Sequence, residues 1–422
     1  MPEQYIPHQN NTRRFELLFF NFFWLGFTIY SISVVFTVTS LANVIILQAV
    51  QILGLILMFT TAIRLIQFKF DNSYLKFIYI LYCMWLFTIL LRNYNFQIDY
   101  HYLKTFFLGG WYRGMLYFSP IILLFPRNFV FYKKVFDVVI IFGIFYIIYD
   151  ILFIKDLLNS DRSSVTSQGI VETFSVLSFS SGFLLLTYAY HSKKRQLLAT
   201  GVTVLALLFA VIRARRGLIF IYGTMIFLSY IFYVFHSKLK LLIIYLTVFI
   251  VLVGAVYVNG VYKPYNNRIY GFLIDKGDKD TRSGVELYFY DDMKTKDWII
   301  GRGINGEYFC PDIEENQLTN YRDTIETGYL QTILKGGLIS LGLFLLIAVP
   351  AIIKGLFYSK NILSKVAGIW IFLSLINSYP STVNAFTLQY LLVWISIGIC
   401  YSKEIRMMPE SNMKDIFLTS TS

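Results

Sequence analysis

Charged residues are scarce in this sequence. They make up 15% of its 422 positions, while 56% are hydrophobic, and a soluble domain carries about 25% charged residues. Its three cysteines do not provide a disulfide framework, and its four scattered histidines lack the spacing of metal ligands. We therefore expect neither a soluble domain nor a metalloenzyme, and we predict that no cofactor is needed.

Other familiar signals are also missing. We find no internal repeat and no low-complexity stretch, and residues 1–14 are polar and do not resemble a cleavable signal peptide. The net charge of +12 would suggest nucleic-acid binding in a soluble protein. In a membrane protein most of this charge follows from the positive-inside rule, so we predict no nucleic-acid partner.

What the sequence does contain is a series of apolar blocks of about 20 residues, the length that crosses about 30 Å of hydrocarbon as a helix. They predict an all-α polytopic membrane protein with about twelve transmembrane helices. The predicted spans are Phe15–Val38, Leu41–Ile63, Leu75–Leu91, Thr105–Phe125, Val135–Ile154, Glu172–Tyr190, Leu197–Ile212, Gly217–Phe235, Leu241–Val258, Gly337–Ile353, Leu363–Asn377 and Val383–Cys400.

The basic residues predict the topology. Most Lys and Arg side chains lie in alternate connecting segments, which the positive-inside rule assigns to the cytoplasm together with both termini. The long loop Asn259–Glu326 is then extracytoplasmic, and its aromatic residues can pack a small folded unit on the membrane. The chain divides into helices 1–9 (residues 1–258), this loop (259–326), and a loop-closing helix with helices 10–12 and a cytoplasmic tail (327–422).

Arginines on the predicted outer side oppose this rule. Arg213, Arg215 and Arg216 lie within four residues, and helical spacing puts Arg213 and Arg216 on one face. Guanidinium groups at such a surface suit phosphate or pyrophosphate, although snorkelling to lipid head groups is the alternative. Arg113 is predicted to lie well inside the fourth span, where it is either functional or paired with a buried carbonyl or carboxylate.

The long loop begins its predicted folded part with a capping-box pattern. Ser283 and Glu286 have the required spacing and precede an apolar run, so a helix should start here. Arg282 would then lie beside a helix N-terminus, where free amides already favour an anion. The alternative is an ordinary surface arginine. Further along, Gly301-Arg302-Gly303 is followed by no helix, so we interpret it as a tight turn rather than a dinucleotide site.

At the end of the loop, helical spacing would place Arg322, Glu326 and Tyr329 on one face. A carboxylate beside the membrane surface can act as a general base toward a sugar hydroxyl. Asp323 and Glu326 also fit a capping box, in which Glu326 only closes the start of a helix. The sequence supports both roles for Glu326.

Taken in order, these motifs resemble those of the bacterial O-antigen polymerase (Wzy) and O-antigen ligase superfamily of type-C glycosyltransferases. The similarity covers about residues 213–353 and consists of Arg215-Arg216-Gly217, Arg282, Gly301-Arg302-Gly303, Glu326-Thr327-Gly328-Tyr329-Leu330 and Gly336-Gly337-Leu338. The family has histidine where this chain has Glu326 and serine where it has Arg215. The first departure favours a polymerase over a ligase.

The resemblance implies a polymerase of undecaprenyl-pyrophosphate-linked oligosaccharide repeat units in O-antigen, capsule or exopolysaccharide synthesis. It would act at the outer face of the inner membrane, with membrane lipid and a chain-length regulator as further partners. Arg216 and Arg282 would stabilise the leaving pyrophosphate, and Glu326 would deprotonate the acceptor hydroxyl. The supporting pyrophosphate-binding residues would be Arg213, Arg215, Arg113, Arg322 and Tyr329. Two alternatives remain: an O-antigen ligase acting on the lipid A core, and a non-enzymatic flippase of lipid-linked oligosaccharides.

Overall fold

The described chain folds into helices and a two-stranded sheet. The computed structural model describes residues 8–37, 39, 43–92, 100–108, 110, 113–158, 165–236, 240–241, 244–245, 247–249, 252, 283–311, 320–381 and 384–418. The elements are α1 (His8–Phe36), α2 (Val44–Leu65), α3 (Ser73–Leu91), α4 (Tyr100–Leu108), the 3₁₀ helix η1 (Gly114–Leu124), α5 (Phe129–Leu152), α6 (Ile154–Leu157), α7 (Val165–Ser178), α8 (Ser181–Leu186), η2 (Tyr188–Tyr190), α9 (Lys193–Ile212), α10 (Arg216–His236), α13 (Ser283–Asp292), α14 (Thr295–Ile300), β1 (Tyr308–Phe309), β2 (Tyr321–Arg322), α15 (Gly328–Phe357), α16 (Ile362–Asn377), α17 (Leu388–Tyr401), α18 (Lys403–Met407) and α19 (Glu410–Leu418).

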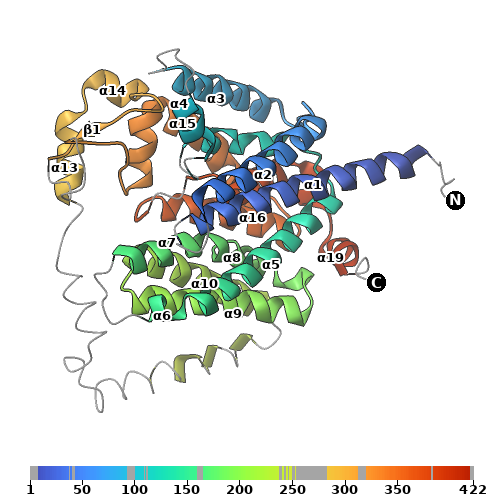
Figure 1. The fold of residues 1–422 in the computed structure, drawn as a ribbon. Coiled ribbons are helices and arrows are strands. Elements are labelled where there is room, and N and C mark those ends of the chain that lie inside the picture. Colours follow the sequence, from blue (N-terminus) through green and yellow to red (C-terminus); the bar gives the residue numbers. More distant parts are fainter. Residues whose placement is uncertain are drawn as a thin grey trace.

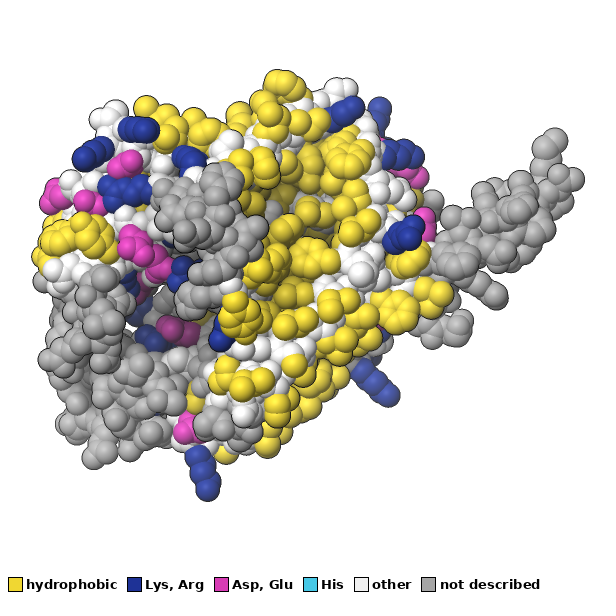
Figure 2. Space-filling model, turned by 45° about the horizontal axis from the view of Figure 1, so that its top comes forward, with side chains coloured by type: hydrophobic (Ala, Val, Ile, Leu, Met, Phe, Trp, Pro, Cys, Tyr) yellow, Lys and Arg dark blue, Asp and Glu magenta, His cyan; other side chains and the backbone are white. Residues whose placement is uncertain are grey.

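Eight stretches of described helix are long and apolar enough to cross a membrane. Three shorter apolar helices, η1, α16 and α17, occupy the positions of predicted spans four, eleven and twelve. The predicted span Leu241–Val258 lies largely outside the described residues. Figure 2 shows hydrophobic side chains across the middle of one face and charged side chains toward its two sides. The all-α polytopic class is thus confirmed, while the count of about twelve stays a prediction.

Asparagine side chains fix where four of these helices begin. Helices α2, α3, α5 and α16 each follow an asparagine with extended backbone. Its side-chain oxygen accepts a hydrogen bond from an otherwise unsatisfied N–H of the first helical turn. The N···O distances are 2.9 Å at Asn43, 3.0 Å at Asn72, 2.8 Å at Asn128 and 2.9 Å at Asn361. The local sequence therefore specifies where these four helices begin.

The single span predicted at Thr105–Phe125 is wrong. Helix α4 ends at Leu108 and η1 begins at Gly114. Between them Gly110 has φ +95°, and Pro120 lies within η1. A left-handed glycine breaks the helix, and proline removes one backbone donor. Arg113 therefore lies at the start of η1, where its side chain is 41% exposed, and not well inside a span.

Among the described residues, ion pairs lie in two groups at opposite ends of the bundle. One group joins segments that the predicted topology places on the cytoplasmic side: Arg127–Asp71 at 3.1 Å and Arg195–Asp137 at 2.7 Å. The other consists of Arg113–Asp323 at 2.7 Å and Arg215–Glu172 at 3.0 Å. Figure 1 shows α13 and α14 at one end of the molecule and α19 at the other. The side of the membrane on which each group lies stays a prediction.

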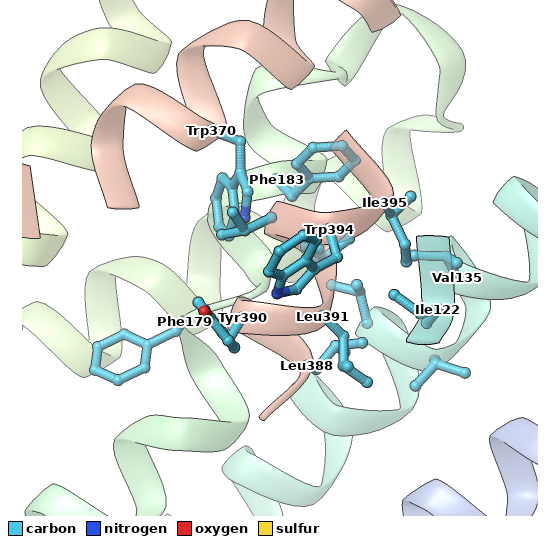
Figure 3. Packing of buried hydrophobic residues seen from close by; sticks show 14 of the residues in the cluster. Ile122, Val135, Phe179, Phe183, Trp370, Leu388, Tyr390, Leu391, Trp394 and Ile395 are labelled. Atoms are coloured by element: carbon cyan, nitrogen blue, oxygen red, sulfur yellow. The ribbon is translucent and has the colours of Figure 1, made fainter. Parts of the chain in front are cut away.

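Helix α17 forms the centre of the bundle. All fourteen of its residues are buried. The ring of Trp394 lies 5.5 Å from that of Tyr82 in α3 and 5.9 Å from that of Phe344 in α15. Figure 3 shows this core together with Trp370 and Phe183, whose rings are 5.3 Å apart. Such aromatic contacts contribute beyond the burial of apolar area, and they fix α17 against the helices around it.

Residues 283–311 and 320–327 form a small folded unit, which we call the loop subdomain. Phe289 of α13 and Tyr308 of β1 are fully buried, with ring centroids 5.4 Å apart, and Trp298 lies 5.7 Å from Phe289. Leu330 and Leu334 from the first turns of α15 complete this core. The predicted packing of aromatic side chains in the loop is confirmed for its described part, and so is the helix start at Ser283.

At the other end of the bundle, His191 is buried in a way that predicts acid sensitivity. Its ring packs edge-on against Phe136 at 4.6 Å, and Nε2 lies 2.9 Å from the Thr187 hydroxyl. Burial, with a smaller contribution from Arg195, lowers the pKa of His191 to about 3. Because the unfolded chain takes up this proton first, the free energy of unfolding should decrease by about 2 kcal/mol from pH 7 to pH 5.

Thermal unfolding of the detergent-solubilised protein at both pH values measures this decrease. In His191→Gln, which keeps a hydrogen-bonding side chain but does not titrate, the difference between pH 7 and pH 5 should be smaller by this amount. An identical pH dependence in both proteins would contradict the assignment.

Candidate functional site

A cavity of about 370 Å³ lies between the loop subdomain and the helix ends next to it. Its wall combines charged, amide and tyrosine side chains with an apolar floor. The polar lining residues are Tyr82, Tyr117, Glu172, Arg322, Thr324, Glu326, Gln331, Thr332, Lys335, Ser340, Asn384 and Tyr390. Segments far apart in the sequence, from α3, η1, α7, the loop subdomain, α15 and α17, thus meet around one space.

A break in α15 forms part of this wall. Gly337 has φ +68° inside the helix, which interrupts the regular hydrogen-bond pattern. The amides of Arg302 and Gly303 donate instead to the carbonyls of Leu334 and Lys335, at 2.7 and 3.0 Å. The predicted tight turn within Gly301–Gly306 is confirmed, since the amide of Gly306 donates to the carbonyl of Gly303 at 3.0 Å. The amides before this turn bind carbonyls of the broken helix.

The close approach of these two backbones predicts an effect on stability. A Cβ at Gly337 would lie 2.1 Å from the carbonyl oxygen of Ile299, and its positive φ disfavours any L side chain. Gly337→Ala should therefore lower the free energy of unfolding by about 2–3 kcal/mol, measured by thermal unfolding in detergent. The matched control is Gly342→Ala in the same helix, where no atom lies within 4 Å of the new Cβ. Equal melting of the two variants would contradict the prediction.

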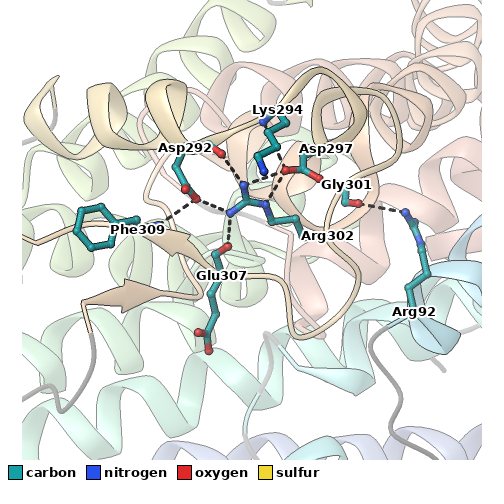
Figure 4. A network of polar contacts seen from close by, with 8 residues as sticks. All are labelled: Arg92, Asp292, Lys294, Asp297, Gly301, Arg302, Glu307 and Phe309. Atoms are coloured by element: carbon teal, nitrogen blue, oxygen red, sulfur yellow. Dashed lines mark hydrogen bonds and ion pairs between the residues drawn. The ribbon is translucent and has the colours of Figure 1, made fainter.

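The turn is held rigid by Arg302. Its guanidinium bonds the carboxylates of Asp292 and Asp297, the second at 2.9 and 3.0 Å, and the carbonyl of Glu307 at 2.7 Å (Figure 4). Partial burial lowers the pKa of Arg302, but these hydrogen bonds outweigh burial and raise it above the ordinary value. The Arg302 guanidinium therefore links α13, α14 and the turn.

Arg92, at the end of α3, attaches the turn to the helix bundle. Its guanidinium donates to the carbonyls of Ile300 and Gly301 and lies over the ring of Trp85, 5.0 Å from its centroid. The indole N–H of Trp85 donates to the carbonyl of Gly336 at 2.8 Å. Burial lowers the pKa of Arg92. The cavity wall is thus fixed from the side of α3 as well.

Glu326 lines the cavity but does not lie on a helix. The backbone at Tyr321–Arg322 is a strand paired with β1, and α15 begins only at Gly328, with Thr327 as its N-cap. The predicted helical face of Arg322, Glu326 and Tyr329 is therefore wrong, because the strand pairing keeps this segment extended. The capping-box interpretation of Glu326 fails for the same reason, since Glu326 precedes the N-cap. Its side chain is exposed.

Two cationic side chains share the cavity with Glu326. Arg322 extends from β2, and Lys335 from the turn of α15 before the break, where its Nζ donates to the carbonyl of Gly306 at 2.9 Å. Tyr308, behind this wall, donates to the carbonyl of Thr324 at 3.3 Å. Burial raises the pKa of Tyr308 to about 12 although the charge of Arg322 opposes the shift. The arrangement offers cations for an anionic group beside a carboxylate.

Ion pairs hold two more of the predicted arginines near the cavity. Arg113 pairs with Asp323, the residue between the two cavity-lining positions 322 and 324. Asp323 is therefore the partner of an arginine rather than a helix cap. Arg215 pairs with Glu172, which itself lines the cavity. Both pairs join elements far apart in the sequence, so they fix the relative positions of the segments around the site.

The three clustered arginines do not form one surface. Helix α9 ends at Ile212, Ala214 has φ +50°, and α10 begins at Arg216. Because the chain turns here, the predicted shared helical face of Arg213 and Arg216 is wrong. Arg213 is completely buried, Arg215 is half-buried at Glu172, and Arg216 is exposed at the start of α10. Arg215 thus binds a residue of the cavity wall.

The structure places Tyr329 outside the cavity lining and does not describe Arg282. Tyr329 lies in the first turn of α15 and donates its hydroxyl hydrogen to the carbonyl of Leu375 in α16. It therefore joins two helices and is not part of the cavity lining. Arg282 lies outside the described residues.

Sequence reasoning missed Lys335 and Asn384 and assigned Glu172 no role in the site. Asn384 donates to the Thr332 hydroxyl at 3.1 Å and lines the cavity beside α15. Lys335 directly precedes the glycine pair Gly336-Gly337 at the edge of the tenth predicted span. A cation followed by two glycines at a helix end is the signal that could have indicated it. Glu172 carries no comparable local signal.

No protein-family model, curated protein or solved structure matches the chain. Within the described residues, no three His, Cys, Asp or Glu side chains are grouped so that they could hold a metal ion. The chemistry of the site is therefore argued from the cavity and its own side chains.

Proposed function

We propose that the protein is a glycosyltransferase that polymerises oligosaccharide repeat units linked to undecaprenyl pyrophosphate. The observation that supports this most is the cavity, which brings the Glu326 carboxylate together with the cations Arg322 and Lys335 at one end of a membrane protein. A lipid-linked pyrophosphate substrate needs cations for its leaving group beside a base for the acceptor. The order of sequence motifs supports the same function.

The proposed reaction is one displacement at a sugar. A hydroxyl of the incoming repeat unit forms a bond to the anomeric carbon of the growing chain, and Glu326 takes the hydroxyl proton. The bond from that carbon to the pyrophosphate oxygen breaks, and the leaving group keeps the electron pair. Arg322 and Lys335 stabilise its developing charge, which is more effective in a shielded cavity than in water. Arg216 and Arg282 remain candidates from the motif resemblance.

The direct test is an assay of purified protein with lipid-pyrophosphate repeat units, followed by gel separation of the products. A ladder of products differing by one repeat unit is expected. Transfer that occurs only when lipid A core is added would indicate a ligase. Movement of the lipid-linked unit across a vesicle membrane without any new glycosidic bond would indicate a flippase. Either result would contradict the polymerase.

We propose further that the loop subdomain faces the outside of the inner membrane and that both termini are cytoplasmic. Lys294 in the loop subdomain and Lys403 at the start of α18 are both exposed. With outer-membrane-permeabilised cells, Lys294→Cys should react with an impermeant maleimide, and Lys403→Cys should react only after lysis. The parent protein gives the background from its three native cysteines. The reverse labelling would overturn this orientation.

A further inference from the structure

A second, larger cavity lies on the side of the helix bundle, between α1, α2 and α5, three candidate membrane spans that pack together in Figure 1. Its volume is about 760 Å³, and it follows α1 from Asn21 to Phe36, which is about 22 Å of helix. Leu25, Val50 and Ile141 are exposed at its edges, so the space is a groove open to the surroundings. We call it the lateral groove.

The lateral groove is apolar along most of its length and polar at one end. Aliphatic and aromatic side chains line it, whereas Lys134 and Asp137 of α5 lie with Asn21 at the end where α1 and α5 begin. Asp137 is paired with Arg195 at 2.7 Å, so its charge is balanced. No described residue forms an ion pair or hydrogen bond with Lys134. The polar end therefore carries one excess positive charge.

A buried tryptophan at the same end of the lateral groove also lacks a hydrogen-bond acceptor within the described part of the chain. Trp24 lines the groove and is 3% exposed, and its indole N–H finds no acceptor among the described residues. A buried donor without a partner costs about 1–3 kcal/mol. The Trp24 ring stacks on Phe131 at 5.9 Å, one turn of α5 before Lys134. Trp24 of α1 thus packs on the turn of α5 that leads to Lys134, and both residues line the groove.

We infer that the lateral groove binds a bilayer glycerophospholipid, whose acyl chain lies along α1 and whose anionic phosphate is bound by Lys134 and Trp24. The long apolar wall suits a hydrocarbon chain, and the unmatched cation and N–H suit a phosphate. The carrier lipid of the proposed reaction is a poorer fit, because its pyrophosphate belongs at the opposite end of the molecule, beside the loop subdomain. Only this exclusion of the carrier lipid rests on the proposed function.

The test measures binding of phosphatidylglycerol to the delipidated, full-length protein by native mass spectrometry in detergent. Diacylglycerol, which lacks the phosphate, and a polyprenyl phosphate are the comparison lipids. Lys134→Met should weaken phosphatidylglycerol binding about fivefold, the share of one lysine in binding an anionic head group. Trp24→Phe keeps an aromatic ring but loses the N–H and part of the ring volume, and it should weaken phosphatidylglycerol binding about threefold to tenfold. The matched control, Lys76→Met, removes an exposed lysine of α3 outside the groove and should bind as the parent does.

Equal binding of phosphatidylglycerol by all four proteins would overturn the proposal, since it would indicate a non-specific lipid shell. Equal binding of diacylglycerol would exclude phosphate recognition, and binding of the polyprenyl phosphate alone would identify a different lipid. If Lys134→Met does not fold, Lys134→Gln decides the question, because glutamine removes the charge but keeps a polar side chain.

Discussion

Replacing Glu326 with glutamine is expected to reduce the rate of polymerisation by about 10²–10⁴-fold, the usual contribution of a general base. Glutamine keeps the size and shape of the side chain but cannot accept a proton at neutral pH. Thermal stability should change little, because Glu326 is exposed and precedes the first residue of α15. The measurement is the initial rate of repeat-unit incorporation by purified protein, with melting temperature determined in parallel.

The cavity offers a matched control for this change. Glu172 is its second carboxylate, and Arg215 binds it at 3.0 Å. In the proposed mechanism Glu172 holds Arg215 in place and Glu326 takes the proton, so Glu172→Gln should cost less in rate than Glu326→Gln. If the order of the two variants is reversed, Glu172 and not Glu326 is the base. If neither variant loses activity, proton abstraction by a cavity carboxylate is excluded.

Removal of the arginine in the cavity should have the second large effect. Arg322→Ala is expected to lower the rate by about 10²–10³-fold, as loss of one charged or polar donor to a developing anion does in other enzymes. Arg322→Lys should recover only part of this, because lysine keeps the charge but lacks the forked pair of donors. The same incorporation assay, at saturating substrate, measures the effect on the chemical step.

Arg127→Ala is the control for this series. Arg127 pairs with Asp71 at the opposite end of the bundle, so its loss should leave the rate unchanged. The sequence resemblance instead assigns the pyrophosphate to Arg216 and Arg282. A normal rate in Arg322→Ala together with inactive Arg216→Ala would favour that assignment and move the leaving group away from the described cavity.

Much of the fold could be predicted from hydropathy because membrane spans are defined by length and apolar composition. The failure at residues 105–125 has a clear reason. Hydropathy measures composition, and Gly110, Gly114 and Pro120 hardly alter it, although they determine whether a helix can continue. These three residues are the sequence signal for the backbone break that places Arg113 at the start of η1.

The site was less accessible to sequence reasoning. Arg322 and Glu326 do line one cavity, but a strand and a bend place them there, and the helix that was predicted is absent from this segment. Pairing between Glu172 and Arg215 or between Arg113 and Asp323 depends on how distant helices pack. No local spacing rule specifies such contacts, because side-chain periodicity relates only neighbours on one helix or strand.

The burial of α17 has a consequence for how the chain is assembled in the membrane. Its fourteen residues extend about 21 Å, less than the hydrocarbon thickness of about 30 Å, and none of them faces lipid. Among the described apolar helices it is also the last to be synthesised. Helices α3, α15 and η1 therefore cannot reach their final packing while the ribosome is still producing the preceding segments. Biogenesis must keep the middle of the bundle accessible until its central helix arrives.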